Sequence, residues 1–168
     1  MQAPSERPGL DLRPVGYLHP DAVTLVARVQ QEYVERYGSP DESPVDPAGF
    51  VLPEGIFLVG YDDSGSPGVP VATGAWRRSP VRVLGGASAV EVKRMFVVAE
   101  RRGRGFARAV LAELEVTARA AGHDLVVLET GLRQPEAIGL YRSAGYEDID
   151  GFGFYRDAPL SRCFGKRI

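Results

Sequence analysis

The sequence has one cysteine, two histidines, no long apolar run and no large excess of either charge. A single cysteine cannot form an internal disulfide, so nothing points to an oxidising compartment. No apolar run approaches the roughly 18 residues that cross a membrane, and Met1–Arg7 lacks the apolar core of a secretory signal. The net charge of −2 argues against a general nucleic-acid binder, which carries a basic excess. We therefore expect a cytoplasmic protein that binds neither membranes nor nucleic acid.

The sequence also lacks clusters of His, Cys, Asp and Glu with the spacing of metal ligands, so we expect no metal. His19 and His123 lie at predicted helix boundaries, where capping or solvent exposure is expected rather than catalysis. Cys163 lies in a predicted strand and is expected in the core rather than as a nucleophile.

The chain is long enough for one domain with a sizeable core, which we expect over 1–168 with 1–8 as a flexible start. Apolar patterns predict strands at 10–15, 56–61, 69–77, 87–98 and 125–129, and short strands within 146–156 and 162–168. Helical spacing predicts helices from Pro20 to Gly38, Gly105 to Ala121 and Pro135 to Tyr141. The proline-rich segment 39–53 is expected to be a surface loop with room for one helical turn. This order predicts a mixed sheet with helices on its faces.

The predicted strand over 87–98 has a period-two pattern. Val92, Phe96 and Val98 are expected on one face, and the opposite face is expected to hold Glu91, Lys93, Met95 and Val97. Arg94 falls on the otherwise apolar face, where a charge is costly unless it is paired or faces a cleft.

The most informative segment is Arg102-Gly103-Arg104-Gly105-Phe106-Ala107, between this strand and a strongly periodic helix. Two glycines let the backbone approach a ligand closely, and the start of the helix adds its positive dipole end. The segment therefore predicts a loop that binds a pyrophosphate. A nucleotide-hydrolysing P-loop is excluded because no Lys-Ser or Lys-Thr follows Gly105. A dinucleotide-binding loop is disfavoured because Arg108 stands where its third glycine is required.

Arg102-x-x-Gly105-x-Ala107 resembles the acyl-CoA pyrophosphate loop of the GNAT superfamily of N-acetyltransferases, in particular its bacterial members that act on small molecules. The preceding Glu91–Val97 resembles the fourth strand of that family, and 135–146 resembles its Ala-Ile-x-Leu-Tyr…Gly-Phe/Tyr segment. The specific part covers about residues 90–147. The resemblance implies an α/β (α+β) fold with a mixed, mostly antiparallel sheet of six to seven strands and about four helices.

The resemblance also implies acetyl-CoA as co-substrate. Backbone N–H groups of five loop residues would hold its pyrophosphate, next to the charge of Arg102: Gly103, Arg104, Gly105, Phe106 and Ala107. Backbone of Phe96, Val97 and Val98 would face the pantetheine arm, because the fourth and fifth strands of this fold splay apart and the cofactor pairs with them. Gln134 stands where the family often has an asparagine that contacts the same arm.

Acetyl transfer to an amine needs a neutral amine, a donor for the oxyanion and a proton for the departing thiolate. By resemblance, Tyr141 would protonate the thiolate, the Val97 N–H would stabilise the oxyanion, and Glu91 would be the general base. An ion pair of Glu91 with Lys93, Arg94 or another base stays an equal alternative, with Glu129 or ordered water then acting as base.

These features predict an N-acetyltransferase that acetylates a primary amine of a small molecule or amino acid by direct transfer in a ternary complex. The alternatives are an acyl-CoA sensor without catalysis and, more weakly, a nucleic-acid or partner-binding domain. Several basic and aromatic side chains would line the acceptor side, favouring a carboxylate-bearing acceptor, or would instead be ordinary surface groups: Arg94, Arg133, Trp76, Arg77 and Arg78. Homodimerisation is common in such folds and stays open here.

Overall fold

The computed structural model describes residues 9–64 and 68–168. The predicted flexible start, 1–8, and the tip of the predicted turn between Asp62 and Gly68 lie outside the described residues. None of the helices in the described part is long and apolar enough to span a bilayer.

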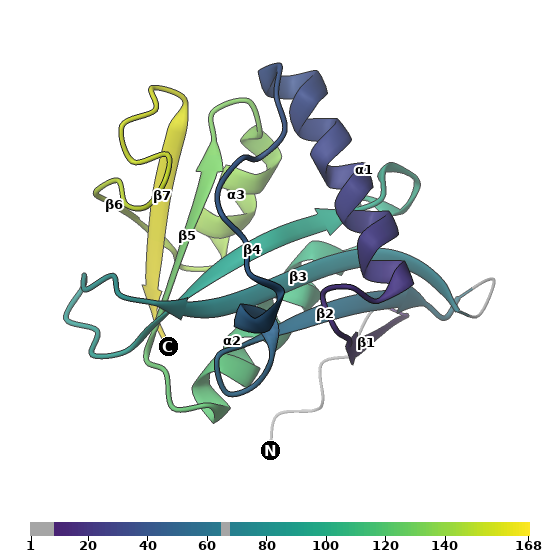
Figure 1. The fold of residues 1–168 in the computed structure, drawn as a ribbon, viewed down its shortest axis with the longest axis horizontal. Coiled ribbons are helices and arrows are strands. Elements are labelled where there is room, and N and C mark those ends of the chain that lie inside the picture. The colour runs from purple at the N-terminus through teal and green to yellow at the C-terminus, as the bar shows by residue number, and fades with distance from the viewer. Residues whose placement is uncertain (1–8, 65–67) are drawn as a thin grey trace.

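One seven-stranded sheet forms the centre of the described part, in the order β1-β2-β3-β4-β5-β7-β6 (Figure 1). Its strands are β1 (Leu10–Pro14), β2 (Gly55–Asp62), β3 (Val69–Ser79), β4 (Ala89–Val97), β5 (Leu125–Gly131), β6 (Glu147–Ile149) and β7 (Ser161–Arg167). Among the strands of residues 9–64 and 68–168, only β4 and β5 pair in parallel. The mixed, mostly antiparallel sheet predicted from the sequence is confirmed.

Three α-helices flank the sheet within the described residues, where about four helices were expected: α1 (Pro20–Tyr37), α2 (Phe106–Ala120) and α3 (Pro135–Ser143). Two short 3₁₀ helices, Pro47–Phe50 and Ala99–Arg101, account for the remaining helical turns. In Figure 1, α1 lies in front of the sheet, and α2 and α3 lie behind it. Gly38 ends α1 with φ of 83°, a left-handed conformation that glycine adopts without strain.

The core lies on both faces of the central strands. Trp76 and Phe57 are fully buried, and the indole N–H of Trp76 donates to Thr117 of α2 at 2.9 Å. The apolar stripe of α2 packs against this region through Val110, Leu111 and Leu114. Helical spacing therefore places the buried face of α2 as the sequence predicts.

The alternation predicted for β4 is wrong beyond Arg94. Lys93 stands opposite Ala75, and Phe96 opposite Thr73, so β4 carries one extra residue in this stretch. Arg94 has φ of 58° at this β-bulge. The bulge puts Phe96 on the same face as Lys93, and it lets the adjacent Lys93 and Arg94 side chains reach one carboxylate.

β4 and β5 pair only near their starts. The ladder joins Ala89–Val92 to Leu125–Leu128 and goes no further, although β4 runs to Val97 and β5 to Gly131. The two strands therefore leave unpaired backbone on both sides of a gap in the middle of the sheet. The splayed strands implied by the family resemblance are present.

The segment 146–156 forms less strand than expected. Only Glu147–Ile149 pairs with β7, and the chain then leaves the sheet in a turn in which Arg156 N–H donates to Gly153 O. Gly153 has φ of 72°, which a strand does not accommodate. Residues 150–160 are consequently a loop.

Candidate active site

A cavity of about 660 Å³ opens where β4 and β5 separate. Ten of the predicted site residues line its wall: Glu91, Phe96, Val97, Arg102, Gly103, Gly105, Phe106, Ala107, Gln134 and Tyr141. Val98 and Arg104 do not line it. The N–H of Val98 instead donates to Val71 O of the neighbouring strand, at 2.9 Å.

One end of the cavity is the glycine loop at the start of α2. Gly103 and Gly105 have φ of 78° and 80°, a conformation that other residues adopt only with strain. In the described part of the chain, the backbone N–H groups of residues 103–108 donate to no protein acceptor. Six consecutive free donors at a helix N-terminus form a site suited to a phosphate or pyrophosphate.

The arginines around this loop are already engaged. Arg102 donates from Nε to Val97 O at 2.9 Å and from Nη2 to Glu32 at 2.7 Å. Arg101 and Arg104 both pair with Asp62, at 2.6 and 3.6 Å. Hydrogen bonds from Ser64 and Arg101 lower the pKa of Asp62 to about 2. The backbone, more than these side chains, therefore presents free donors to an anion.

The Val97 amide faces the gap between β4 and β5. Because the Val98 N–H bonds to β3, the alternation of an antiparallel ladder turns the N–H and C=O of Val97 the other way. Arg102 donates a hydrogen bond to the Val97 carbonyl, and the Val97 N–H has no partner among the described residues. A free amide at this point can donate to an oxygen atom that lies in the gap.

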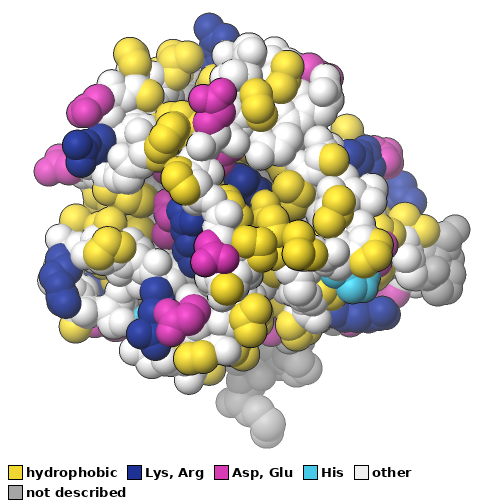
Figure 2. Space-filling model, in the orientation of Figure 1, with side chains coloured by type: hydrophobic (Ala, Val, Ile, Leu, Met, Phe, Trp, Pro, Cys, Tyr) yellow, Lys and Arg dark blue, Asp and Glu magenta, His cyan; other side chains and the backbone are white. Residues whose placement is uncertain are grey.

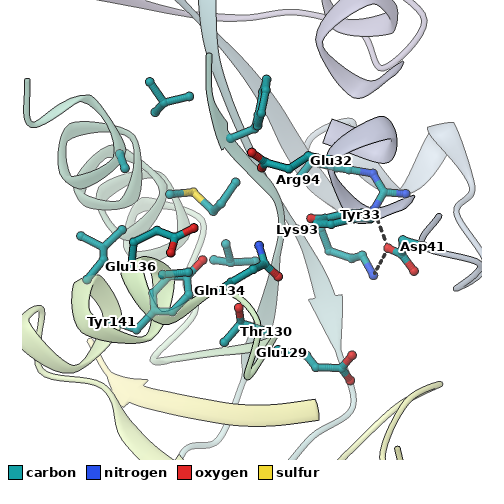
Figure 3. A pocket seen from close by; sticks show the side chains of 18 of the residues that line it. Glu32, Tyr33, Asp41, Lys93, Arg94, Glu129, Thr130, Gln134, Glu136 and Tyr141 are labelled. Atoms are coloured by element: carbon teal, nitrogen blue, oxygen red, sulfur yellow. Dashed lines mark hydrogen bonds and ion pairs between the residues drawn. The ribbon is translucent and has the colours of Figure 1, made fainter. Parts of the chain in front are cut away.

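Tyr141 reaches the cavity from α3 (Figure 3). Its ring packs against Tyr146 and Phe164, and the side chain is buried. Burial, aided by the nearby Tyr33, raises the pKa of the Tyr141 hydroxyl far above its usual value. The hydroxyl is therefore protonated at neutral pH and can donate a proton.

Glu91 is held in an ion pair. Its Oε1 lies 3.0 Å from Nη2 of Arg77 and 3.1 Å from Nε of the same side chain. Arg77 stands directly opposite Glu91 in the β3–β4 ladder, so the sheet register makes this contact. The partner is Arg77, not Lys93 or Arg94, and this contact occupies the Oε1 atom of the carboxylate.

Glu129 is the other carboxylate at the gap. It lies near the end of β5, half-buried in the cavity wall, and no protein cation lies within 4.0 Å of it among the described residues. Burial raises its pKa to about 7. The positive charge of Lys93 lowers this pKa, and the negative charges of Glu91 and Asp41 raise it. A carboxyl group that titrates near neutral pH can both accept and release a proton there.

Asp41 is a site residue that the sequence did not single out. Its Oδ2 lies 2.5 Å from Nη1 of Arg94 and 3.6 Å from Nζ of Lys93 (Figure 3). Lys93, Arg94 and the hydrogen bonds from Ser43 hold the pKa of Asp41 well below its usual range, although burial alone would raise it. The ion pair between Asp41 and Arg94 explains how the charge of Arg94 is tolerated in a central strand. The only sequence signal for it was the acidic character of the loop after α1.

The last turn of α1 contacts the β5–α3 loop across the gap. Arg36 and Arg133 each donate to the other's backbone carbonyl at 2.8 Å. The Tyr37 hydroxyl donates to the amide oxygen of Gln134 at 3.2 Å, and a Cβ built on Gly131 would lie 2.0 Å from that hydroxyl. This α1 contact therefore needs glycine at 131 and orients the Gln134 amide in the cavity wall.

Other singled-out residues lie away from the cavity wall. His19 caps α1 by accepting the Asp21 N–H at 3.1 Å, whereas His123 is buried against Trp76 rather than exposed. Trp76 cannot line an acceptor site because α2 covers it. Cys163 is buried in β7, as expected.

Arg78 and Arg133 both have protein partners in the structure. Arg78 pairs with Glu54 at the surface, 3.4 Å away, and Arg133 belongs to the α1 contact. No group of three or more metal-ligand side chains was found among residues 9–64 and 68–168.

Comparison with known proteins identifies the family. The Acetyltransferase (GNAT) family profile matches residues 25–146. The IAA acetyltransferase of Azospirillum brasilense is 45% identical over 78 residues, which are 46% of this chain and 51% of that protein. The chain thus matches about half the length of this curated relative.

Solved structures share the fold. A protein of Klebsiella pneumoniae assigned as an acyl-CoA N-acyltransferase has a TM-score of 0.73 and 26% identity, over 96% of this chain and 99% of that one. NAA60 of Arabidopsis thaliana in complex with acetyl-CoA has a TM-score of 0.65 and 17% identity, over 95% and 98% of the two chains. At 17% identity the second likeness shows the fold alone. The profile match and the shared architecture show that the chain belongs to the acetyltransferase (GNAT) family.

Proposed function

We propose that this protein transfers an acetyl group from acetyl-CoA to a primary amine of a small molecule or amino acid, directly, in a ternary complex. The observation that carries the proposal is the run of free N–H groups at residues 103–108, which opens into the gap between β4 and β5. A diphosphate on this loop leaves its pantetheine arm room to enter the gap. The acetyl-CoA complexes of structural neighbours from Arabidopsis and Elizabethkingia anophelis support the choice of donor.

Each part of the donor has candidate partners in the chain. The pyrophosphate is held by the loop amides of 103–107, and the pantetheine arm runs along the free edge of β4 at Val97. The backbone of Phe96 faces β3 instead, so only its side chain lines the arm's path. Gln134 offers its amide to the same arm, with its oxygen already oriented by Tyr37. Val98, whose N–H is bonded to β3, would act only after a local rearrangement.

The reaction is an addition followed by an elimination. Glu129 takes a proton from the ammonium form of the acceptor, because its pKa of about 7 lets the carboxylate form act at neutral pH. The amine nitrogen then attacks the thioester carbon, and the Val97 N–H donates to the oxyanion. The C–S bond breaks as Tyr141 donates its proton to the departing thiolate, and the nitrogen returns its second proton to the Tyr141 oxygen, so that an amide, CoA and neutral Tyr141 result. Glu91 stays a candidate base, although its carboxylate is already paired with Arg77.

Calorimetry with acetyl-CoA and CoA tests the donor site, and release of free thiol on adding amines tests transfer. We expect binding of both nucleotides and thiol release with at least one primary amine. Absence of acetyl-CoA binding by the folded protein would refute the proposal. Binding without transfer to any amine would favour the acyl-CoA sensor instead. The single domain over 1–168, the cytoplasmic location and the oligomeric state stay predictions from the sequence.

A further inference from the structure

Two cations share one carboxylate at the end of the cavity away from the glycine loop. Lys93 and Arg94 both reach Oδ2 of Asp41, and their side chains are only 12% and 3% exposed. Lys93 also donates from Nζ to Ser43 Oγ at 2.8 Å. Asp41 can neutralise one of these two charges, so the group of three carries a net positive charge in a sheltered place.

The same group has an unused donor. Arg94 is 4% exposed, and its buried Nε donates to no acceptor in the described part of the chain. Both Arg94 and Lys93 line the cavity. A buried cation whose donors are not all satisfied is unfavourable, and a negative charge placed beside it in the cavity would offset part of that cost.

A carboxyl group faces these cations without touching them. Glu129 and Lys93 extend toward the same side of the cavity in Figure 3. Among the described residues, no ion pair joins Glu129 to Lys93, whereas Glu91 and Arg77 nearby neutralise each other. The acceptor end therefore presents a positive and a negative wall with space between them.

We infer that the acceptor is an amino acid with a free carboxylate, which binds to Lys93 and Arg94 while its amine points to Glu129. The inference rests on the proposed function and narrows its acceptor class. A planar carboxylate matches the N–H donors of a guanidinium and an ammonium group. The carboxylate of a zwitterionic amino acid would thus face Lys93 and Arg94, and its ammonium group would face Glu129. Tyr155, Pro159 and Leu160 of the loop 150–160 form the adjoining wall, which leaves an apolar region for the side chain of the amino acid.

A matched set of acceptors tests the inference. After a screen of the common amino acids, kcat/KM is compared for the best one, its amide and its decarboxylated amine. We expect the free amino acid to be preferred by about tenfold or more, the range of a hydrogen bond to a charged group. Lys93→Met should remove most of this preference, and Lys93→Arg should restore it. The ratio of substrates is the readout, because a general folding defect lowers all rates alike.

Equal or better activity with the amide and the decarboxylated amine would overturn the inference and leave the proposed function intact. Acetyl-CoA binding without transfer to any amino acid would also overturn it. A Lys93→Met variant that keeps the full preference would remove the role of the cations. Lack of acetyl-CoA binding by the wild-type protein would refute the proposed function and the inference with it, and calorimetry distinguishes that case.

Discussion

Arg77 and Glu91 face each other across the β3–β4 ladder, with guanidinium Nη2 3.0 Å from carboxylate Oε1. Arg77 also donates to the backbone carbonyl of Pro44, at 2.9 Å, so it ties the loop after α1 to the sheet. The pair thus has a structural role at the edge of the candidate site. It leaves Glu129 as the carboxylate without a cationic partner, and the two residues can be separated by experiment.

Glu129→Gln should abolish the acidic limb of the pH–rate profile. In the wild-type protein, kcat/KM should fall as the pH drops below about 7, because protonation of Glu129 removes the base. The variant should be slower at pH 8, by about 10²-fold or more, and its remaining pH dependence should follow only the neutral fraction of the acceptor amine, without a step near pH 7. Steady-state rates between pH 5.5 and 9 check it. Glu91→Gln is the matched control and should keep the limb; a limb lost in that variant instead would reassign the base.

Glu129→Gln should also stabilise the fold at high pH. The folded-state pKa of about 7 lies above the unfolded value, so the folded protein is penalised for ionising Glu129 as the pH rises. The variant should unfold at a higher temperature than wild type at pH 8, and the two should converge near pH 4, where the wild-type carboxyl is protonated. Thermal melts at the two pH values measure this. A Glu129→Gln variant that is less stable than wild type at pH 8 would contradict the conclusion that ionising the buried Glu129 destabilises the fold.

Tyr141→Phe should lower kcat by about 10²-fold while leaving the acetyl-CoA affinity nearly unchanged. The phenyl ring keeps the packing against Tyr146 and Phe164, and only the proton donor is lost. Single-turnover rates and calorimetry separate the two effects. Tyr146→Phe is the control, because the Tyr146 hydroxyl lies 3.4 Å from Glu115 and the residue does not line the cavity. Equal turnover in Tyr141→Phe would remove the assigned role.

Gly105→Ala should weaken acetyl-CoA binding by about tenfold. Gly105 has φ of 80° directly before α2, where a side chain costs about 1–2 kcal/mol or shifts the loop amides. Gly139→Ala provides the comparison, since a Cβ there meets no atom within 4 Å and the residue lies within α3. That change should leave binding intact and raise stability by roughly 0.5–1 kcal/mol. Calorimetry on both variants decides whether the loop geometry matters.

Asp41→Asn should destabilise the fold by about 3 kcal/mol, because Lys93 and Arg94 lose their shared counter-charge. The pKa of Asp41 is lowered in the folded protein, so its contribution is present above pH ~4 and lost as the pH falls further. The variant should therefore show a flatter stability profile below pH 4. Urea unfolding measures this, and Asp157→Asn, 94% exposed, should behave as wild type.

The elements that the sequence predicts well are those fixed by local patterns. The apolar stripe and the capping glycine of α1, the stripe of α2 and the continuous apolar run of β5 all lie where predicted. The glycine loop could be read as a phosphate site because positive φ and free amides are local properties of that segment.

The partners in the site could not be read from the sequence, because tertiary structure sets them. The bulge at Arg94 has no local signal and reverses the faces expected for Phe96 and Val97. Arg77 meets Glu91 only through the sheet register. Asp41 lies 53 positions from Arg94 in a loop whose path depends on packing. Short strands are expected within 146–156 because aromatic residues favour strands, but only Glu147–Ile149 forms one and Gly153 turns the chain beyond it.

The C-terminal half of α1 contacts both sides of the gap between β4 and β5. Glu32 holds Arg102 of the glycine loop at 2.7 Å, and Arg36 and Arg133 join the helix to the β5–α3 loop. A helix that contacts both sides of the gap links them mechanically, so a change in its length or tilt moves the glycine loop and the β5–α3 loop together. Engineering a new acceptor preference by exchanging the loop after α1 would consequently require transplanting this helix as well.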